Sequence, residues 1–295
     1  MEQLVDLHTH STASDGTASP TNLVEQAERL GLTAIAITDH DTVGGIDEAL
    51  QAGNRFSIEV VPGVEISVDA VAPDGSASSL HILGYFIDHQ NVELLNALGD
   101  RQNDRNQRNQ QMLDKLNQLG IPLTLEQVQS FQGKDGSLGR PHFAQAMVAH
   151  GMVKDMDEAF SEYLARGARA YVHKKRLNQK QGIALIRQAG GVAALAHPAH
   201  FLQHYDYFTE LLRDLKKMGM QALETYYGEY SAQQTQYLLN LARKFGLAAC
   251  GGSDFHGETK PGLHLGSGRG QLKVPYSCLE ELKLKKAAQK RKVNS

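Results

Sequence analysis

Histidines stand beside carboxylates in several short motifs of this chain, which has 13 His and no Trp. In His8-Thr9-His10 both imidazoles would lie on one face of a strand, because side chains alternate between faces with a period of two. Asp254 and His256 repeat that spacing with one ligand of each kind. The candidates to bind metal are His8, His10, Asp15, His40, Glu65, His81, His197, Asp254 and His256.

These candidates comprise six imidazoles and three carboxylates. Groups of this kind are costly to bury unless a cation holds them. A set of nitrogen and oxygen ligands without thiolate favours Mn, Zn or Fe, whereas Mg would take more oxygen. Because each ion takes about four to six ligands, solvent included, the set is large enough for more than one ion. The sequence predicts two to three divalent metal ions, with Mn preferred and Zn, Fe or Mg as alternatives.

Apolar runs precede most of these residues. Strands are expected at residues 3–7, 33–38, 191–196, 220–225 and 246–250, and the segments 57–68 and 80–87 carry Glu65 and His81. Helices are expected over residues 20–31 and 180–190. This alternation predicts an α/β fold with a buried parallel sheet, which a chain of this length could close into a barrel. Functional side chains gather at the C-terminal strand ends of such barrels, so the motifs should converge on one mouth.

The pattern changes between residues 96 and 176, where polar helical sequence replaces the apolar runs. From residue 100 to 176 there are 12 Lys or Arg against 9 Asp or Glu, which leaves a net charge of −6 on the remainder. We interpret residues 96–176 as a small helical cap domain inserted into a barrel of residues 1–95 and 177–295, close enough to cover its mouth. The basic tail, residues 282–292, is expected to be a frayed, solvated helix.

The composition excludes several classes of protein. A chain with 41% hydrophobic residues, 21% charged residues and a net charge of −3 resembles a soluble enzyme, and it has no overall basic excess for nucleic acid or a membrane surface. Two cysteines cannot form a disulfide framework, and the N-terminus has no signal-peptide pattern. Both observations favour a cytoplasmic location. No apolar run approaches the ~20 residues of a spanning helix. We therefore expect neither a membrane nor an obligate protein partner.

Six motifs, in this order, carry a resemblance to a known family: HTHSTASDG, AIAITDHDT, PGVEIS, HILGY, ALAHP and GGSDFH. Together they resemble the polymerase-and-histidinol-phosphatase superfamily of metal-dependent phosphoesterases, abbreviated PHP, over residues 1–95 and 177–270. The resemblance implies a distorted, seven-stranded, TIM-like (β/α) barrel with a trinuclear metal site.

Transferred position by position, the resemblance implies three ion sites. Their ligands would be His8, His10, Glu65 and Asp254 for one ion, Asp15, His40 and His256 for a second, and Glu65, His81 and His197 for a third. In the inserted region, RNQRN at 105–109 and GRPHFA at 139–144 further resemble the subgroup of nucleotide 3',5'-bisphosphate phosphatases and 5'-3' exoribonucleases.

The leading hypothesis is a metal-dependent phosphatase that removes the 3'-phosphate from nucleoside 3',5'-bisphosphates, for example converting adenosine 3',5'-bisphosphate to AMP and phosphate. A metal-bound water of lowered pKa would give the hydroxide that attacks phosphorus. Asp254, His256 and His40 are the residues expected to act in this step. The acid that protonates the leaving oxygen stays open among His256, His200 and a metal-bound water.

Basic groups outside the metal ligands are expected to bind the dianionic phosphate. Arg101, Arg105 and Arg108 fall on one face of a predicted helix, for which a solvated face is the alternative. Arg140 lies in a turn-prone run, residues 133–141, where the backbone can approach an anion. The predicted substrate-binding residues are Arg105, Arg108, Arg140, Asn178 and His200. The cluster Lys174-Lys175-Arg176 could hold a second phosphate or solvate a hinge.

Other activities stay open beside the leading hypothesis. A 5'-3' exonuclease acting on short RNA or DNA would use the same metals, although the inserted region offers few aromatic side chains for base stacking. A histidinol phosphatase would share the barrel but not this insert. A non-catalytic, metal-stabilised nucleotide-binding module belongs to another class, and the intact ligand set argues against it. An amidohydrolase would normally add a bridging lysine that no strand end supplies here. The expected partner is a small nucleotide, with short oligonucleotides as a further substrate.

Overall fold

The computed structural model describes residues 3–131, 138–173 and 176–293. Its internal contacts divide the chain into two compact units. Met1–Asn96 together with Arg176–Ser295 form the first, which we call the barrel unit, and Ala97–Lys175 form the second, which we call the insert unit.

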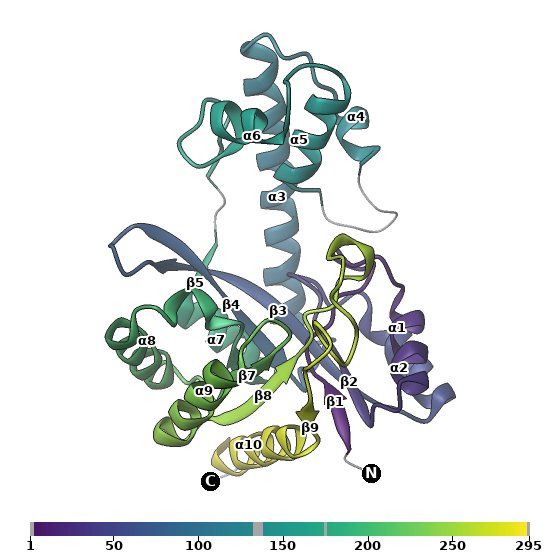
Figure 1. Ribbon diagram of the computed structural model, residues 1–295, viewed down its shortest axis with the longest axis vertical. Helices are drawn as coiled ribbons and strands as arrows, with labels where there is room; N and C mark the ends of the chain where they lie inside the picture. Colours follow the sequence, from purple (N-terminus) through teal and green to yellow (C-terminus); the bar gives the residue numbers. More distant parts are fainter. Residues whose placement is uncertain (1–2, 132–137, 174–175, 294–295) are drawn as a thin grey trace. The chain divides into compact units, whose positions relative to one another are not determined.

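The wall of the barrel unit consists of seven strands among the described residues: β1 (Leu4–Asp6), β2 (Ala34–Ile37), β3 (Glu59–Val71), β4 (Ala77–Tyr85), β6 (Val192–Leu195), β7 (Ala222–Tyr227) and β8 (Ala248–Gly252). Their order is β8-β7-β6-β4-β3-β2-β1 (Figure 1). Beyond β1, the Leu7 amide donates to the Gly251 carbonyl at 3.1 Å, which brings β1 against β8 and nearly closes the sheet. The predicted TIM-like barrel is confirmed. Two short strands, β5 (Leu177–Asn178) and β9 (Val274–Pro275), pair with β3 and β1.

One strand departs from the predicted parallel sheet. β4 runs antiparallel to both β3 and β6, whereas the other wall pairs are parallel. The cause is local, because a tight turn in which the Ala72 amide donates to the Ser76 carbonyl joins β3 to β4. A turn this short joins only antiparallel strands, since a parallel pair needs a crossover of about a dozen residues. His81 therefore lies within β4 and not at a C-terminal strand end.

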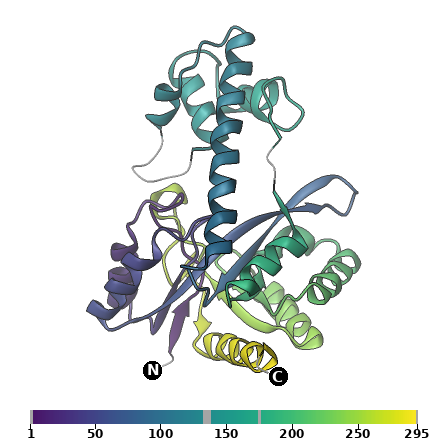
Figure 2. The same ribbon diagram turned by 180° about the vertical axis from the view of Figure 1, so that it is seen from behind.

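Helices cover the outer face of the barrel wall (Figures 1 and 2). They are α1 (Pro20–Arg29), α2 (Ile46–Phe56), α7 (Gln179–Gln188), α8 (Tyr205–Lys217) and α9 (Ala232–Phe245). In α1, Ser19 caps the first turn, and Leu23, Val24 and Ala27 supply the buried stripe. The strand they cover, β2, is buried along its whole length. Both helices predicted from periodicity are thereby confirmed.

The C-terminal segment forms α10 (Ser277–Val293), so the helix predicted for residues 282–292 is confirmed, whereas the solvated interpretation is wrong for Leu282. Leu279 and Leu282 are fully buried in the same apolar cluster as Val5 and Val274. The buried apolar face of α10 includes Leu279, which lies before residue 282. The basic residues 282–292 taken alone therefore did not indicate this face. The helix, yellow in Figure 2, packs across the end of the barrel unit opposite the C-terminal strand ends of β1 and β8.

The insert unit is helical and has a core of its own. It contains most of α3 (Val92–Gln118), α4 (Leu125–Gln129), α5 (Arg140–Ala149), α6 (Met156–Glu158) and a π-helical turn η1 (Ala159–Leu164). Phe143, Met147 and Leu116 are fully buried at its centre. A separate core is what a separate domain requires. That this domain covers the barrel mouth stays a prediction.

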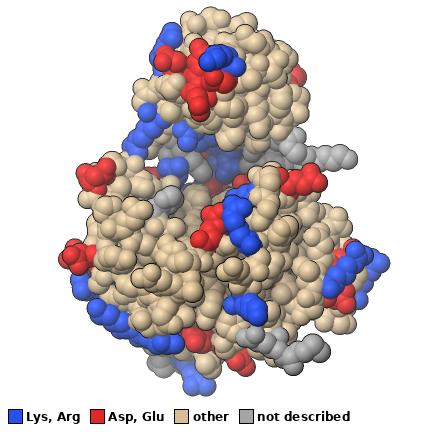
Figure 3. All heavy atoms as spheres, viewed as in Figure 1, with Lys and Arg blue, Asp and Glu red and all other residues tan. Residues whose placement is uncertain are grey.

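The surface shows no large field of one charge on the face drawn in Figure 3, where acidic and basic side chains are interspersed. Among the described residues, no helix combines the length and the apolar character that crossing a membrane requires. Cys250 and Cys278 are both buried and free.

Candidate metal centre

The loop that follows β1 is fixed by a buried carboxylate. Asp39 accepts hydrogen bonds from the backbone amide and from the hydroxyl of Ser11, each at 2.7 Å. A Cβ at Gly16 would lie 2.2 Å from the His10 carbonyl oxygen, so only glycine lets the loop fold back this tightly. The loop thereby places the Asp15 carboxylate 3.8 Å from the His10 ring.

Glu65 lies at the centre of the cluster and is fully buried. Its carboxylate is within 3.4 Å of five imidazoles. Oε2 lies 3.4 Å from His8, 3.3 Å from His10 and 3.0 Å from His40, and Oε1 lies 3.0 Å from His81 and 2.9 Å from His197. One side chain in the middle of β3 thus joins histidines from β1, β2, β4 and β6 or the residues just after them.

Asp254 supplies a second carboxylate beside the first pair of histidines. Its Oδ1 lies 3.4 Å from His8, 3.2 Å from His10 and 3.5 Å from His256. The backbone of Asp254 has φ of 56°, and that of His197 has φ of 20°. Non-glycine residues adopt such angles at a cost of order 1–3 kcal/mol, which the surrounding fold must offset. In both residues the strained backbone aims a side chain into the cluster.

Eight of the nine side chains fall into three overlapping groups, and within each group the ligand atoms lie within 4.8 Å of one another. These groups are His8, His10, Glu65 and Asp254, then His10, Asp15, His40 and His256, then His40, Glu65 and His81. His197 joins the third through the Oε1 atom of Glu65 that it shares with His81. The structure therefore brings together all nine candidates that the sequence singled out.

The arrangement fits a bound cation. Two atoms that each lie about 2.1 Å from one ion are about 3.0–3.4 Å apart, which is the spacing between His8, His10, Glu65 and Asp254. Among the described residues, Nε2 of His8 and both ring nitrogens of His10 are buried without a hydrogen-bond partner. An unsatisfied buried polar atom costs about 1–3 kcal/mol, and coordination to metal would remove that cost.

The electrostatics of the cluster also favour a cation. Burial alone would lower the pKa of His10, but the carboxylates of Asp254 and Glu65 outweigh it and raise this pKa to about 9. Burial would raise the pKa of both carboxyls, yet the surrounding imidazoles hold these pKa values well below the usual range. The carboxylates are thus ionised and attract positive charge, for which protons and metal ions compete.

Comparison with known proteins gives the family. The PHP domain matches residues 6–249, which is most of the chain. This chain belongs to the PHP family. Its relatives include a 5'-3' exoribonuclease of Haemophilus influenzae, 35% identical over 256 residues and covering 87% of this chain and 91% of the relative. A 3',5'-nucleoside bisphosphate phosphatase of Chromobacterium violaceum is 32% identical over 262 residues, with coverage of 89% and 90%.

A solved structure agrees with this placement. It comes from Bifidobacterium adolescentis, is assigned as a metal-dependent phosphoesterase, and covers 96% of both chains with a TM-score of 0.76 and 31% identity. The findings support hydrolysis of phosphoesters by a metal-dependent PHP enzyme. They leave the substrate undecided, because the two curated relatives carry different activities in their names.

Glu224, in β7, is a residue of the PHP centre that the sequence analysis missed. It is fully buried, its Oε1 lies 2.8 Å from Nδ1 of His8, and its Oε2 accepts from the His197 amide at 2.6 Å. A carboxylate on the far nitrogen of a ligating imidazole fixes its tautomer and orientation. The available signal was an acidic residue inside the apolar run MQALET, which has no chelating neighbour to draw attention to it.

Two further residues contact the outer oxygen of Asp254. The Tyr227 hydroxyl donates to Oδ2 at 2.8 Å, and the Lys260 ammonium donates to the same atom at 2.6 Å. The Lys260 side chain is 40% exposed. The PHP centre therefore carries a basic group at its rim that the sequence did not single out, because Lys260 follows the last motif in an irregular segment.

The predicted substrate-binding arginines lie in the insert unit. Arg101 and Arg105 are 6% and 9% exposed, so a solvated helix face is the wrong interpretation for these two. Arg108 is half-buried and donates to Oδ1 of Asn109 at 3.2 Å. Arg140 donates to the Leu164 carbonyl at 3.1 Å, and its guanidinium lies over the Tyr171 ring. Binding of substrate by Arg105, Arg108 and Arg140 stays a prediction.

The other predicted contacts lie in or beside the barrel unit. Asn178 caps α7, and its side chain accepts from the Gln181 amide. His200 lies in the turn η2 (Pro198–Phe201), but its side chain is outside the described part of the structure. Lys174 and Lys175 are also outside the described residues. Arg176 lies 3.4 Å from Asp69. Roles for these residues in binding stay predictions.

Proposed function

We propose that this PHP protein removes the 3'-phosphate from nucleoside 3',5'-bisphosphates. The observation that supports the proposal most directly is the Glu65 carboxylate within 3.4 Å of five imidazoles, since such a cluster suits a multinuclear metal centre. The choice of substrate is supported by the relative from Chromobacterium violaceum, which is named for this activity.

The nine residues would hold two to three divalent ions, Mn preferred. His8, His10, Glu65 and Asp254 would hold one ion, Asp15, His40 and His256 another, and Glu65, His81 and His197 a third. Ions bound there would supply a water of lowered pKa as nucleophile and positive charge for the phosphoryl oxygens.

The side chains around that centre would position the reacting groups. Asp254 is held from outside by Tyr227 and Lys260, which keeps Oδ1 facing the histidines. His256 is 5% exposed, and its Nδ1 lies 2.8 Å from the Asp254 carbonyl oxygen, which directs Nε2 to Asp15 at 3.4 Å. His40 keeps 21% of its side chain exposed and can meet a substrate. Lys260, whose side chain is 40% exposed, would bind a phosphoryl oxygen.

A second candidate is a 5'-3' exoribonuclease, favoured by the relative from Haemophilus influenzae. The two activities share their chemistry. A bisphosphate phosphatase breaks the bond between the 3' oxygen and phosphorus, and a 5'-3' exonuclease that releases 5'-mononucleotides breaks the same bond. They differ only in whether the phosphorus carries further nucleotides. The same metal centre would therefore serve both substrates.

The test is a substrate panel with added Mn. It compares phosphate release from adenosine 3',5'-bisphosphate with that from 5'-AMP and 3'-AMP, and nucleotide release from a short 5'-phosphorylated RNA. We expect fast turnover of the bisphosphate and little from either monophosphate, with the loss of both activities in Asp254→Asn. Faster release from the RNA would establish the exonuclease instead. Turnover of all three small substrates at similar rates would contradict both proposals.

A further inference from the structure

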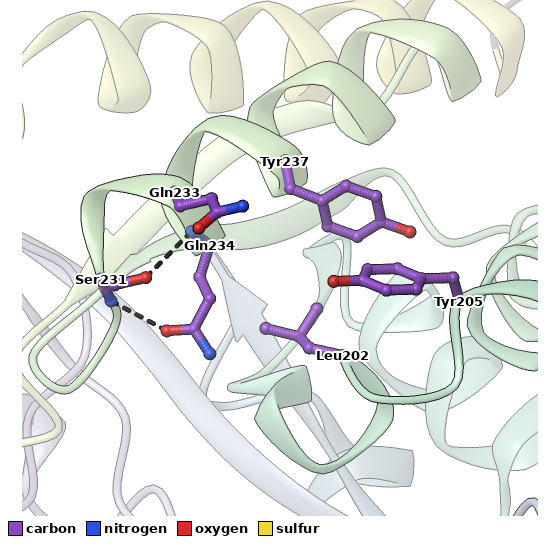
Figure 4. Close-up of a pocket in the computed structure, with 6 residues that line it drawn as sticks. All are labelled: Leu202, Tyr205, Ser231, Gln233, Gln234 and Tyr237. Atoms are coloured by element: carbon purple, nitrogen blue, oxygen red, sulfur yellow. Dashed lines mark hydrogen bonds between the residues drawn. The ribbon is translucent and has the colours of Figure 1, made fainter.

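A cavity of about 630 Å³ lies in the barrel unit between the segments that begin α8 and α9 (Figure 4). It is lined by Leu202, Tyr205, Ser231, Gln233, Gln234 and Tyr237, which come from the first turns of α8 and α9 and from the segments just before them. Its volume falls within the range of about 300–1,000 Å³ that small-molecule sites occupy. None of the lining residues is among those assigned to the metal centre above.

Both walls of the cavity come from segments that directly follow residues at or beside the metal cluster. Leu202 lies five positions after His197, and Ser231 lies four positions after Tyr227, whose hydroxyl contacts Asp254. The His197 and Tyr227 rings are 5.6 Å apart, and the next ring along the chain, Tyr230, is 5.1 Å from Tyr227. These segments follow β6 and β7, so they lie on the side of the barrel where the strands end and where such enzymes bind substrate.

The lining suits a flat, uncharged, aromatic group. Tyr205 is 57% exposed, and its ring meets that of Tyr237 edge to face at 5.0 Å, which leaves a ring face of Tyr205 accessible. All six lining residues are uncharged, in contrast to the metal cluster. Stacking of a base on an aromatic side chain is worth about 1–3 kcal/mol and tolerates any base.

Polar groups of the cavity are fixed in position by the start of α9. Ser231 accepts from the Gln234 amide, and the Gln234 Oε1 accepts from the Ser231 amide at 2.9 Å (Figure 4). This capping box holds the Gln234 amide group in one orientation and leaves its Nε2 hydrogens outside the motif. A preorganised amide beside an aromatic ring is the combination that binds the edge and the face of a nucleobase.

We propose that this cavity binds the nucleobase of the nucleotide whose 3' phosphoester is hydrolysed. Tyr205 stacks on the base, Tyr237 supports the Tyr205 ring from the side, and the Gln234 amide contacts the edge of the base. The inference rests on the proposed function, because it requires a nucleotide substrate at the metal centre.

The first experiment compares adenosine 3',5'-bisphosphate with its base-free analogue, 1-deoxyribose 3,5-bisphosphate. For Tyr205→Ala we expect KM for the adenosine substrate to rise about tenfold, with kcat little changed and no effect on the analogue. Tyr205→Phe, which keeps the ring and loses only the hydroxyl, should retain the wild-type KM. An equal effect of Tyr205→Ala on both substrates, or no effect on either, would overturn the proposal.

A second experiment tests the cavity without turnover. The chain has no Trp, so 2-aminopurine riboside 5'-phosphate can be excited apart from the protein, and its fluorescence is quenched when it stacks. We expect saturable quenching by the metal-free wild type and by Tyr205→Phe, and a Kd about tenfold weaker for Tyr205→Ala. Quenching that is the same for all three proteins would overturn the subsite. If the protein hydrolyses neither bisphosphate yet shows the expected quenching, the proposed activity fails and the base site stands.

Discussion

The barrel unit and the insert unit both contain buried charged residues, but they arrange them differently. In the barrel unit, five imidazoles that lie on or just after four strands converge within 3.4 Å of the Glu65 carboxylate. In the insert unit, Arg101 and Arg105 are buried on one helix, and Arg140 contacts its own unit through the Leu164 carbonyl. The first arrangement leaves buried polar atoms unsatisfied unless a cation binds. The second is compatible with a structural role or with substrate binding.

Buried charged residues therefore indicate a binding site in the barrel unit but not in the insert unit. A strand end in a barrel fixes the direction of a side chain and its neighbours across the sheet, so several motifs constrain one another. A helix face fixes only the spacing along one element. Variants in the two units should therefore differ in the size and the kind of their effect.

The largest effect is expected for Glu65→Gln, which keeps the shape of the side chain and removes the charge at the centre. Turnover should fall by more than the ~100-fold that loss of an outer partner of a metal ligand costs, and bound metal should fall with it. Activity and metal content by elemental analysis measure this. Glu59→Gln is the matched control, since Glu59 lies on the same strand and pairs with Lys283. A Glu65→Gln protein that keeps its full metal content would place the ions elsewhere.

A smaller effect is expected for Glu224→Gln, because Glu224 acts through His8 and His197. We expect metal affinity and kcat to fall about 10–100-fold, with KM little changed. Competition with a chelator and steady-state kinetics measure the two quantities. Glu281→Gln is the control, as Glu281 accepts from the Ala249 amide and has no contact with the cluster. Equal losses of metal affinity and kcat in both variants would mean that Glu224 contributes only to folding.

The affinity for metal should depend on pH in the barrel unit. The pKa of His10 is about 9 in the metal-free protein, so below that pH a metal ion must displace a proton from this ring. Affinity for Mn should therefore weaken as the pH falls from 9 toward 6, and binding should release protons. Calorimetry in buffers of different ionisation enthalpy counts these protons. Affinity that is constant over this range would mean that the imidazoles are already neutral.

The smallest effect is expected in the insert unit. Arg108→Ala should raise KM for a nucleotide substrate about two- to fivefold and leave metal content unchanged, because a half-exposed ionic contact is worth about 0.2–1 kcal/mol. Arg169→Ala is the control in the same unit, since its guanidinium lies over the Tyr163 ring. An unchanged KM for Arg108→Ala would remove this residue from the predicted binding set.

Much of the metal centre could be predicted from the sequence, because chelating pairs such as His8 with His10 and Asp254 with His256 indicate both the type of ligand and its geometry. Glu224 could not be predicted, since a single acidic residue in an apolar strand has no second ligand at chelating spacing. The direction of β4 depended on a tight turn before His81, which an apolar run does not reveal. The buried state of Arg101 depends on tertiary packing that helical spacing cannot supply.

The central claim is that the buried cluster around Glu65 is a metal centre that hydrolyses phosphoesters. The direct test is titration of Mn into chelator-treated protein while bound ions and phosphate release from adenosine 3',5'-bisphosphate are measured together. The account predicts no turnover without metal, turnover that rises as two to three ions bind, and neither full binding nor turnover in Asp254→Asn. Full turnover by the metal-free protein, or identical metal binding by the wild type and Asp254→Asn, would contradict it.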